Sequence, residues 1–280
     1  MTQPAVSIQL NNLQQQFDLP LTEIIGRKIY ITDFGMELYR LATSILEQVH
    51  SIHYKTNTFK GMLSGKLKVS AVSTGKYIMP YYLKDFLKAN PRIDLVLDVT
   101  NKAKVIEHLE KNEVDFCLVS VLPKKIDLSE ELLLPNNLVL SAPADHELTY
   151  KTRLHKSVFA QLPLIYREEG SGTRATMQQY FQKAGIEPTI KMELTSTEAV
   201  KQAVIAGLGF SVLPLISLKN ELKLNSIKIL PVQGMPLKSQ WRLVWLKQKK
   251  FSAVATAYLD FIRKEKSTIY QKYFSWTEKY

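Results

Sequence analysis

The fold is decided by residues 65–119, which read GKLKVSAVSTGKYIMPYYLKDFLKANPRIDLVLDVTNKAKVIEHLEKNEVDFCLV. Three short apolar runs alternate here with two segments whose apolar residues recur at helical spacing. The apolar runs are 67–72, 95–99 and 114–119. This strand–helix order predicts an α/β fold, with a parallel sheet and helices on its faces. Ligands of such sheets bind where strands end and helices begin. We therefore expect a cleft lined by Ser73, Thr74, Thr100 and Asn101.

A second α/β unit begins near the apolar run 138–142. It continues with apolar segments at 162–167, 192–194 and 207–214, and with a helix over 198–206. The run 241–246 then crosses back, and a helix over 253–264 returns to the first unit. The pattern predicts a two-lobed domain over 65–275 that forms a hinged clamp. Its first lobe would comprise 65–140 and 242–275, and its second lobe 141–241.

Small and hydroxylated residues gather at helix starts in the second lobe as well. By itself, Gly170-Ser171-Gly172 is most simply an ordinary flexible loop, but Thr173-Arg174 follows it at a helix start. Free N–H groups and hydroxyls at such a place suit carboxylate or phosphate oxygens. Lys76 and Arg174 offer positive charge, although either could face solvent. The second-lobe candidates for ligand binding, which the family resemblance given below implies, are Glu169, Gly170, Ser171, Gly172, Thr173 and Thr197.

Residues 1–32 form a separate, more polar module. Apolar residues at spacings of 4, 3 and 4 predict a helix from Gln3 to Phe17, in which Thr2 is placed to cap and Pro4 lies in the first turn. Gly26-Arg27-Lys28 then forms a turn between two apolar pairs, as in a hairpin. Periodicity alone leaves two interpretations open, a generic amphipathic helix and a DNA-reading helix whose short polar side chains meet base edges.

Residues 33–60 are expected to form one long helix. Leu38, Ile45, Ile52 and Phe59 are each seven residues apart, which favours a coiled-coil dimer seam over a helix buried in a single domain. His50 and His53 lie three apart, but no further ligand is near them, so surface histidines are expected rather than a zinc site.

Composition sets the outer limits. The chain has 280 residues, 45% of them hydrophobic and 22% charged, and no stretch has the length or polarity of a membrane span. The net charge of +11 lies outside residues 1–60, where five basic and five acidic residues cancel, so DNA binding has to be argued from the motif.

The single cysteine, Cys117, lies in an apolar run and is expected to be buried and inert. No metalloprotease, phosphate-loop or serine-hydrolase motif is present, so we expect neither an enzyme nor a cofactor.

The whole chain resembles LysR-type transcriptional regulators. The resemblance is carried by TQPAVSIQLNNL at 2–13, a Gly-Arg wing, ITDFG at 31–35, STGKY at 73–77, EGSGTR at 169–174 and STEAVKQAVIAGLGFSVLP at 196–214. It is nearest to the branch that controls carbon-dioxide fixation (RuBisCO) operons. Ile8 departs from the pattern, because many members carry arginine there.

The resemblance implies a partial winged helix-turn-helix, a linker helix and a two-lobed effector domain like a periplasmic binding protein. The DNA-binding candidates are Thr2, Gln3, Pro4, Ser7, Gln9 and Arg27. The helix that supports the recognition helix would precede Met1, so we expect a longer natural product and weak specific DNA binding by the chain as written.

Taken together, these features predict a cytoplasmic, homo-oligomeric transcriptional regulator. Its expected partners are operator DNA, a small anionic metabolite, a second copy of the chain and, through the family resemblance, RNA polymerase and a tetramer. Two alternatives remain open. One is a ligand-sensing dimerisation partner that binds no operator, and the other is a stand-alone solute-binding protein.

Overall fold

The computed structural model describes residues 2–59, 63–123 and 125–280, with the backbone alone described for residues 47 and 50–59. The chain forms two compact units, which divide between residues 63 and 64. Each unit has its own set of elements.

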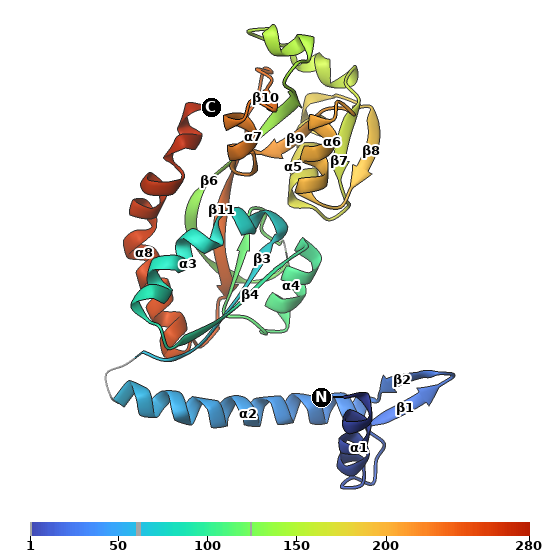
Figure 1. Cartoon of the computed structure of the whole chain (residues 1–280), viewed down its shortest axis with the longest axis vertical. Helices are drawn as coiled ribbons and strands as arrows, with labels where there is room; N and C mark the ends of the chain where they lie inside the picture. The colour runs from blue at the N-terminus through green and yellow to red at the C-terminus, as the bar shows by residue number, and fades with distance from the viewer. Residues whose placement is uncertain (1, 60–62, 124) are drawn as a thin grey trace. The chain divides into compact units, whose positions relative to one another are not determined.

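The first unit consists of two helices and a hairpin (Figure 1). Its elements are α1 (Gln3–Gln14), β1 (Thr22–Ile25), β2 (Lys28–Ile31) and α2 (Asp33–Phe59). Thr2 precedes α1 in an extended conformation, but its side chain makes no capping hydrogen bond. Helix α1 ends three residues earlier than expected, because the Gln14 side chain binds the following loop. Its Oε1 accepts from the Leu21 N–H at 2.6 Å, and its Nε2 donates to the Leu19 carbonyl at 3.0 Å.

The hairpin matches the expected wing. Strands β1 and β2 pair antiparallel, and Gly26 supplies the left-handed φ of +66° that the two-residue turn requires. Thr32 then joins the wing to α2, since its hydroxyl donates to the Pro20 carbonyl at 2.6 Å and accepts from the Gly35 N–H at 3.0 Å. The start of α2 is therefore held directly on the segment that leads out of α1.

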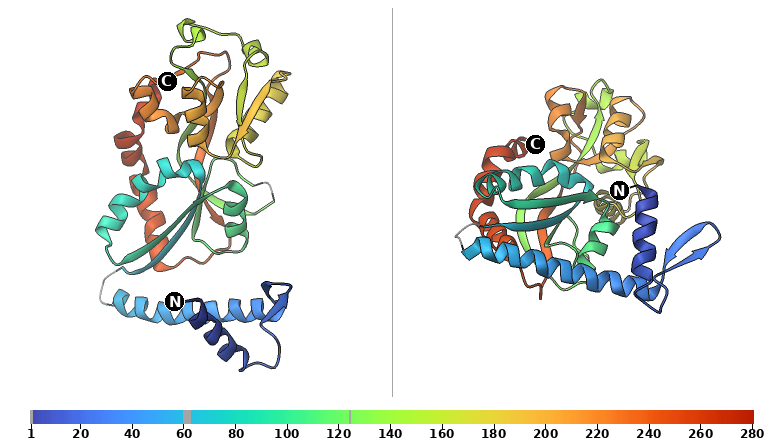
Figure 2. Two further views of the ribbon diagram at one scale, coloured as in Figure 1. Left: turned by 45° about the vertical axis from the view of Figure 1, so that its right-hand side comes forward. Right: turned by 60° about the horizontal axis from the view of Figure 1, so that its bottom comes forward.

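The second unit is an α/β structure with two lobes joined by two long strands (Figure 2). The strands are β3 (Gly65–Val72), β4 (Ile93–Thr100), β5 (Phe116–Val119), β6 (Leu128–Pro143), β7 (Leu164–Arg167), β8 (Ile190–Leu194), β9 (Ser211–Pro214), β10 (Ile227–Ile229) and β11 (Leu237–Leu246). The helices are α3 (Met79–Ala89), α4 (Lys102–Glu110), α5 (Gly172–Ala184), α6 (Thr197–Ile205), α7 (Lys219–Lys223) and α8 (Ala253–Tyr273). A 3₁₀ turn, η1 (Ser73–Tyr77), follows β3.

The main sheet has the strand order β10-β6-β11-β5-β3-β4, with β9 also paired to β6. In the first lobe β3 runs parallel to β4 and β5, as the βαβαβ pattern predicts. Strands β6 and β11 run antiparallel along their whole shared length and cross from one lobe to the other. The end of β6 pairs with β9 and β10 of the second lobe, where β7 and β8 form a small parallel sheet.

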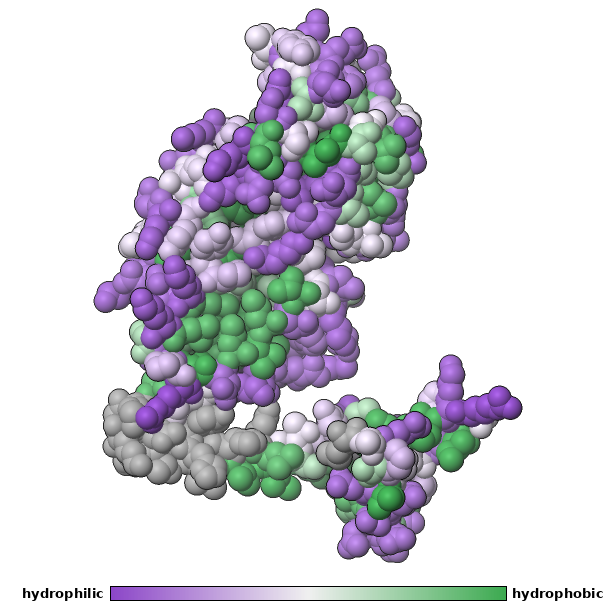
Figure 3. All heavy atoms as spheres, viewed as in Figure 1, coloured by the Kyte–Doolittle hydropathy of each residue, from purple (hydrophilic) through white to green (hydrophobic). Residues whose placement is uncertain are grey.

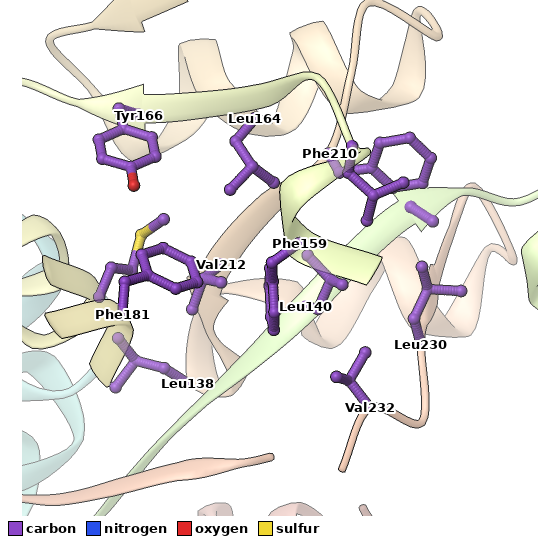
Figure 4. Close-up of a cluster of buried hydrophobic side chains, with 13 residues drawn as sticks. Leu138, Leu140, Phe159, Leu164, Tyr166, Phe181, Phe210, Val212, Leu230 and Val232 are labelled. Atoms are coloured by element: carbon purple, nitrogen blue, oxygen red, sulfur yellow. The ribbon is translucent and has the colours of Figure 1, made fainter. Parts of the chain in front are cut away.

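Each lobe has its own apolar core. In the second lobe, Phe159, Phe181 and Phe210 pack with aliphatic residues of the crossing strand and β7 (Figure 4). In the first lobe, Phe116 is fully buried against Trp245 and Tyr258. Burying side chains of this size contributes roughly 2–3 kcal/mol each, so each lobe is a stable frame for a cleft between them.

Two elements of the second unit extend well beyond the sequence prediction. Strand β6 begins ten residues before the predicted run, because Leu128–Asn137 pairs with β11 despite its charged and turn-forming residues. Helix α8 continues nine residues past the predicted end, because Ile269 remains buried at 3% exposure beyond a polar stretch. In both cases tertiary contacts outweigh local sequence preference.

Candidate functional site

The residues predicted to meet DNA lie on the surface of the first unit. Thr2, Gln3, Pro4, Ser7 and Gln9 are exposed along α1, and Arg27 is exposed at the wing tip. No residue of α1 is buried, and Ile8 is 61% exposed. The six side chains are therefore accessible to a partner. Their contact with DNA remains a prediction.

Helix α2 presents an apolar stripe in the first unit. Leu41, Ile45 and Val49 are 58%, 60% and 48% exposed, and Figure 3 shows a group of apolar side chains on the described part of this helix. Leu38 is half-buried, whereas the side chains of Ile52, Phe59, His50 and His53 lie outside the described residues. The stripe is available to a second helix, as a dimer seam requires.

A narrow recess, with about 20 Å³ of space open to a water molecule, lies between the two lobes of the second unit. We call it the inter-lobe cavity. Its first-lobe wall is Val72, Ser73, Thr74, Asn101, Lys102, Val119, Ser120 and Val121. Its second-lobe wall is Arg167, Glu168, Ser171, Gly172, Thr173 and Pro214. Asn136 of β6 and Trp241 of β11 complete it from the crossing strands.

Helix starts supply most of the polar groups of the inter-lobe cavity. The end of β3 leads directly into η1, which places Ser73 and Thr74 on the wall. Asn101 caps α4, because its Oδ1 accepts from the Lys104 N–H at 2.9 Å. Ser171 precedes α5, and its hydroxyl makes no capping bond. The first turns of α4 and α5 leave N–H groups without partners within their helices, which favours an anion nearby.

Glycine at 172 permits a close approach of the two lobes. A Cβ added there would lie 3.3 Å from Ser120 Oγ and 3.8 Å from a Val121 methyl group, across the cavity. The first turn of α5 can therefore reach the strand ends of the first lobe. A larger residue would narrow the space available to a ligand.

Arg167 is the most buried charge of the inter-lobe cavity, at 3% exposure. Its Nε and one terminal nitrogen each donate to a different carboxylate oxygen of Glu168 at 2.7 Å. The other terminal nitrogen donates to the Thr197 hydroxyl at 2.6 Å. The terminal nitrogen that binds Glu168 also donates to the Ser73 hydroxyl of the opposite lobe, at 3.3 Å. The guanidinium thus links both lobes, and its charge is balanced by the Glu168 carboxylate on the same wall.

Lys102 is the second cation on the wall. It is partly buried at the first position of α4, and this burial lowers the pKa of its ammonium group. Desolvation of the charged form is the cause. An anion in the cavity would offset that cost.

Several predicted residues do not line the inter-lobe cavity. Thr100 is half-buried at the end of β4 and pairs with Val72. Glu169 and Gly170 are the exposed central residues of a turn closed by a 3.2 Å bond from the Ser171 N–H to the Glu168 carbonyl. Gly170 has a φ of +84°, so it serves the turn. Thr197 reaches the site through its bond to Arg167.

The two cations proposed from the sequence are engaged elsewhere. Lys76 lies 3.4 Å from Glu198, and Arg174 pairs with Glu193. The cationic side chains on the cavity wall are instead Lys102 and Arg167, which sequence reasoning missed together with Asn136 and Trp241. Arg167 ends an apolar strand immediately before the glycine-rich loop, and that position was the one available signal.

Cys117 is fully buried in β5, as expected, and its thiol lies 3.6 Å from the Val105 carbonyl. Burial raises the pKa of the thiol to about 12. Near pH 8 only about one molecule in ten thousand would carry a thiolate, compared with roughly a quarter for an unperturbed cysteine. We expect the folded protein to resist an aromatic disulfide reagent and the urea-unfolded protein to react at once. Rapid labelling of the folded protein would contradict this burial.

Among the residues that the structure describes, no three metal-ligating side chains come together. No helix among them is long and apolar enough to cross a membrane.

Comparison with known proteins identifies the family. Residues 60–267 match the LysR substrate binding domain. The chain is 34% identical over 265 residues to the RuBisCO operon transcriptional regulator of Allochromatium vinosum, covering 95% of this chain and 88% of that protein. An exposed helix followed by a hairpin, a long apolar-striped helix and a two-lobed α/β unit are consistent with this match. The chain belongs to the LysR family of transcriptional regulators.

Solved structures agree with the fold. The regulatory domain of Synechocystis PCC6803 CcmR, in complex with 2-PG, matches with a TM-score of 0.69 and 33% identity, over 72% of this chain and 97% of that one. Full-length CbnR complexed with its target DNA matches with a TM-score of 0.71 over 94% of this chain and 90% of that one. At 19% identity, that second match supports the fold alone.

Proposed function

We propose that this regulator binds operator DNA through α1 and the β1–β2 wing and is controlled by a small anionic metabolite in the inter-lobe cavity. The observation that carries the effector assignment is the convergence of Lys102, Arg167 and two helix starts on one recess. Hydroxyls of Ser73, Thr74, Ser171 and Thr173 would supply further bonds to its oxygen atoms.

A compact ligand with two acidic groups fits this arrangement best. One group would lie at the start of α5 and the other near Lys102 at the start of α4, each neutralised by a helix terminus. The CcmR regulatory domain, 33% identical to this chain, was solved in complex with 2-PG (2-phosphoglycolate), which carries a phosphate and a carboxylate. This ligand is therefore the first probe for the cavity.

The same proposal covers oligomerisation and the effect of the regulator on transcription. The exposed stripe of α2 would pair with a second copy, so that two reader helices face two operator half-sites. Effector binding would draw the lobes together about β6 and β11, change the association of dimers into a tetramer and alter contact with RNA polymerase. A cytoplasmic location follows from the operator as partner.

The test is a titration of DNA from upstream of the protein's own gene, with and without 2-phosphoglycolate. Specific binding whose affinity or footprint changes with the ligand would support the proposal. Ligand binding without any DNA binding would favour the two alternatives, a ligand-sensing dimerisation partner or a solute-binding protein, which the oligomeric state of the chain would then distinguish. DNA binding without any response to anions would refute the effector assignment.

The Arg27→Ala change tests the wing. Arg27 is exposed at the turn, so its loss should leave the fold intact and remove one phosphate contact. We expect operator affinity to fall roughly equally for all sequences and the slope of log affinity against log salt to decrease by about one. Arg92→Ala, an exposed arginine in the second unit, is the matched control and should change neither quantity. An unchanged salt slope for Arg27→Ala would contradict the wing contact.

A further inference from the structure

Two residues that line the inter-lobe cavity each have a buried polar atom with no hydrogen-bond partner within the described protein. These atoms are the indole Nε1 of Trp241, in a side chain 1% exposed, and the Oδ1 of Asn136, in a side chain 4% exposed. Burying such groups unpaired costs about 1–3 kcal/mol each, so a structure that keeps two of them beside a binding cavity points to a partner in the ligand.

The sheet register brings these two side chains together. Strands β6 and β11 are antiparallel, and Leu134 pairs with Trp241 while Asn136 pairs with Ser239. Residues two apart on a strand share a face, so Asn136 and Trp241 are diagonal neighbours on the same face of the sheet. The Cα atoms of such neighbours are roughly 7 Å apart. The Asn136 amide donates to Ser239 Oγ at 2.9 Å, which turns its remaining polar atom, an acceptor, to other partners.

One atom is a donor only and the other is an acceptor. Indole N–H can donate but not accept, whereas an amide oxygen can accept but not donate. A carboxylate or phosphate oxygen would satisfy Trp241 and leave Asn136 facing negative charge. A hydroxyl group satisfies both, because its oxygen accepts from the indole while its proton goes to the amide.

We propose that Trp241 and Asn136 read a hydroxyl group of the effector, so that the preferred ligand is a hydroxylated small acid rather than a simple diacid. This inference rests on the proposed anionic effector and names its class more narrowly. The acidic groups would lie against the helix starts, and the hydroxyl would point to the crossing strands that form the hinge. Recognition of the hydroxyl would thereby act directly on the strands that link the two lobes.

The test compares three probes by calorimetry on the full chain. 3-Phosphoglycerate carries a hydroxyl, 3-phosphonooxypropanoate is the same molecule without it, and 2-phosphoglycolate is a shorter diacid without one. For the wild-type chain we expect the hydroxylated probe to bind roughly ten-fold or more tightly than its deoxy counterpart, because the latter leaves both buried atoms unpaired.

The Trp241→Phe variant removes the donor and keeps most of the ring. We expect it to lower the affinity for the hydroxylated probe roughly five-fold and to leave the affinity for the deoxy probe unchanged. Asn136→Ala is the second variant, with the same expected pattern. Trp245→Phe lies on the same strand but outside the cavity wall, and should preserve the wild-type preference.

The outcomes separate the two proposals. Equal binding of the hydroxylated and deoxy probes by the wild-type chain would overturn the inference and indicate a retained water between the two groups. An equal loss of affinity for both probes in Trp241→Phe would overturn the inference and indicate that the Trp241 ring only packs against the ligand. Binding of none of the three anions would refute the anionic effector itself, and the inference with it.

Discussion

The Arg167→Met protein is expected to lose binding of 2-phosphoglycolate by at least about 100-fold and to be less stable by roughly 3 kcal/mol. The guanidinium is 3% exposed and holds Glu168, Thr197 and Ser73 by four hydrogen bonds. Methionine would fill a similar volume but leave the Glu168 carboxylate, 20% exposed, without its counter-ion beside an anion site. Calorimetry measures the affinity, and urea unfolding measures the stability.

Arg242→Met is the matched control. Arg242 also donates to both oxygens of a carboxylate, that of Glu130, at 2.6 and 2.8 Å. This pair is more open, with side-chain exposures of 25% and 36%, so its removal should cost at most about 1 kcal/mol. Equal losses of stability for the two variants, or full ligand affinity in Arg167→Met, would contradict a central role for Arg167.

The part of the fold that sequence predicted correctly is the part whose signals are local. In the first lobe each strand and the helix after it lie within about thirty residues, so apolar runs and helical spacing suffice to order them. The wing was equally accessible, because Gly26 marks a turn whose backbone conformation favours glycine. The extent of β6 could not be predicted, since its first half is a strand only through pairing with β11, which lies about a hundred residues away in sequence.

The same distinction between local and long-range signals holds for the residues of the candidate site. Ser73, Thr74, Asn101, Ser171, Gly172 and Thr173 were predicted from helix starts, and all six line the inter-lobe cavity. Their role in effector binding stays a prediction. Helix starts are local features, and parallel topology brings them to one edge of the sheet.

Arg167 and Trp241 could not be found in this way. In sequence, Arg167 only ends an apolar strand, and Trp241 only begins one. Their importance depends on burial and on the pairing of strands whose contacting residues are about a hundred positions apart, as in the bond between Asn136 and Ser239. A single sequence contains no measure of either.

The Gly35→Ala change is expected to disable the DNA-reading unit while leaving the effector unit intact. A Cβ at Gly35 would lie 3.0 Å from the carbonyl carbon of Leu21 and closer still to its oxygen. That oxygen accepts the Thr32 N–H at 3.1 Å, and Leu21 is only 4% exposed. Because the obstacle is backbone, no side-chain rotation relieves it, and the start of α2 must move away from the segment that joins α1 to the wing.

Overpacking of this kind costs about 1–3 kcal/mol, and we expect operator affinity to fall roughly ten-fold or more as the reader helix and wing lose their mutual placement. Hydrogen exchange should quicken at residues 21, 32 and 35, whose N–H groups make the junction bonds.

Gly26→Asn is the control, since its φ of +66° is one that asparagine tolerates and an added Cβ there meets nothing within 4 Å. It should leave exchange at the junction unchanged. Affinity for 2-phosphoglycolate should be unaltered in both variants, because the inter-lobe cavity lies wholly within the second unit. Wild-type DNA affinity in Gly35→Ala would mean that the reader helix and wing do not depend on this junction.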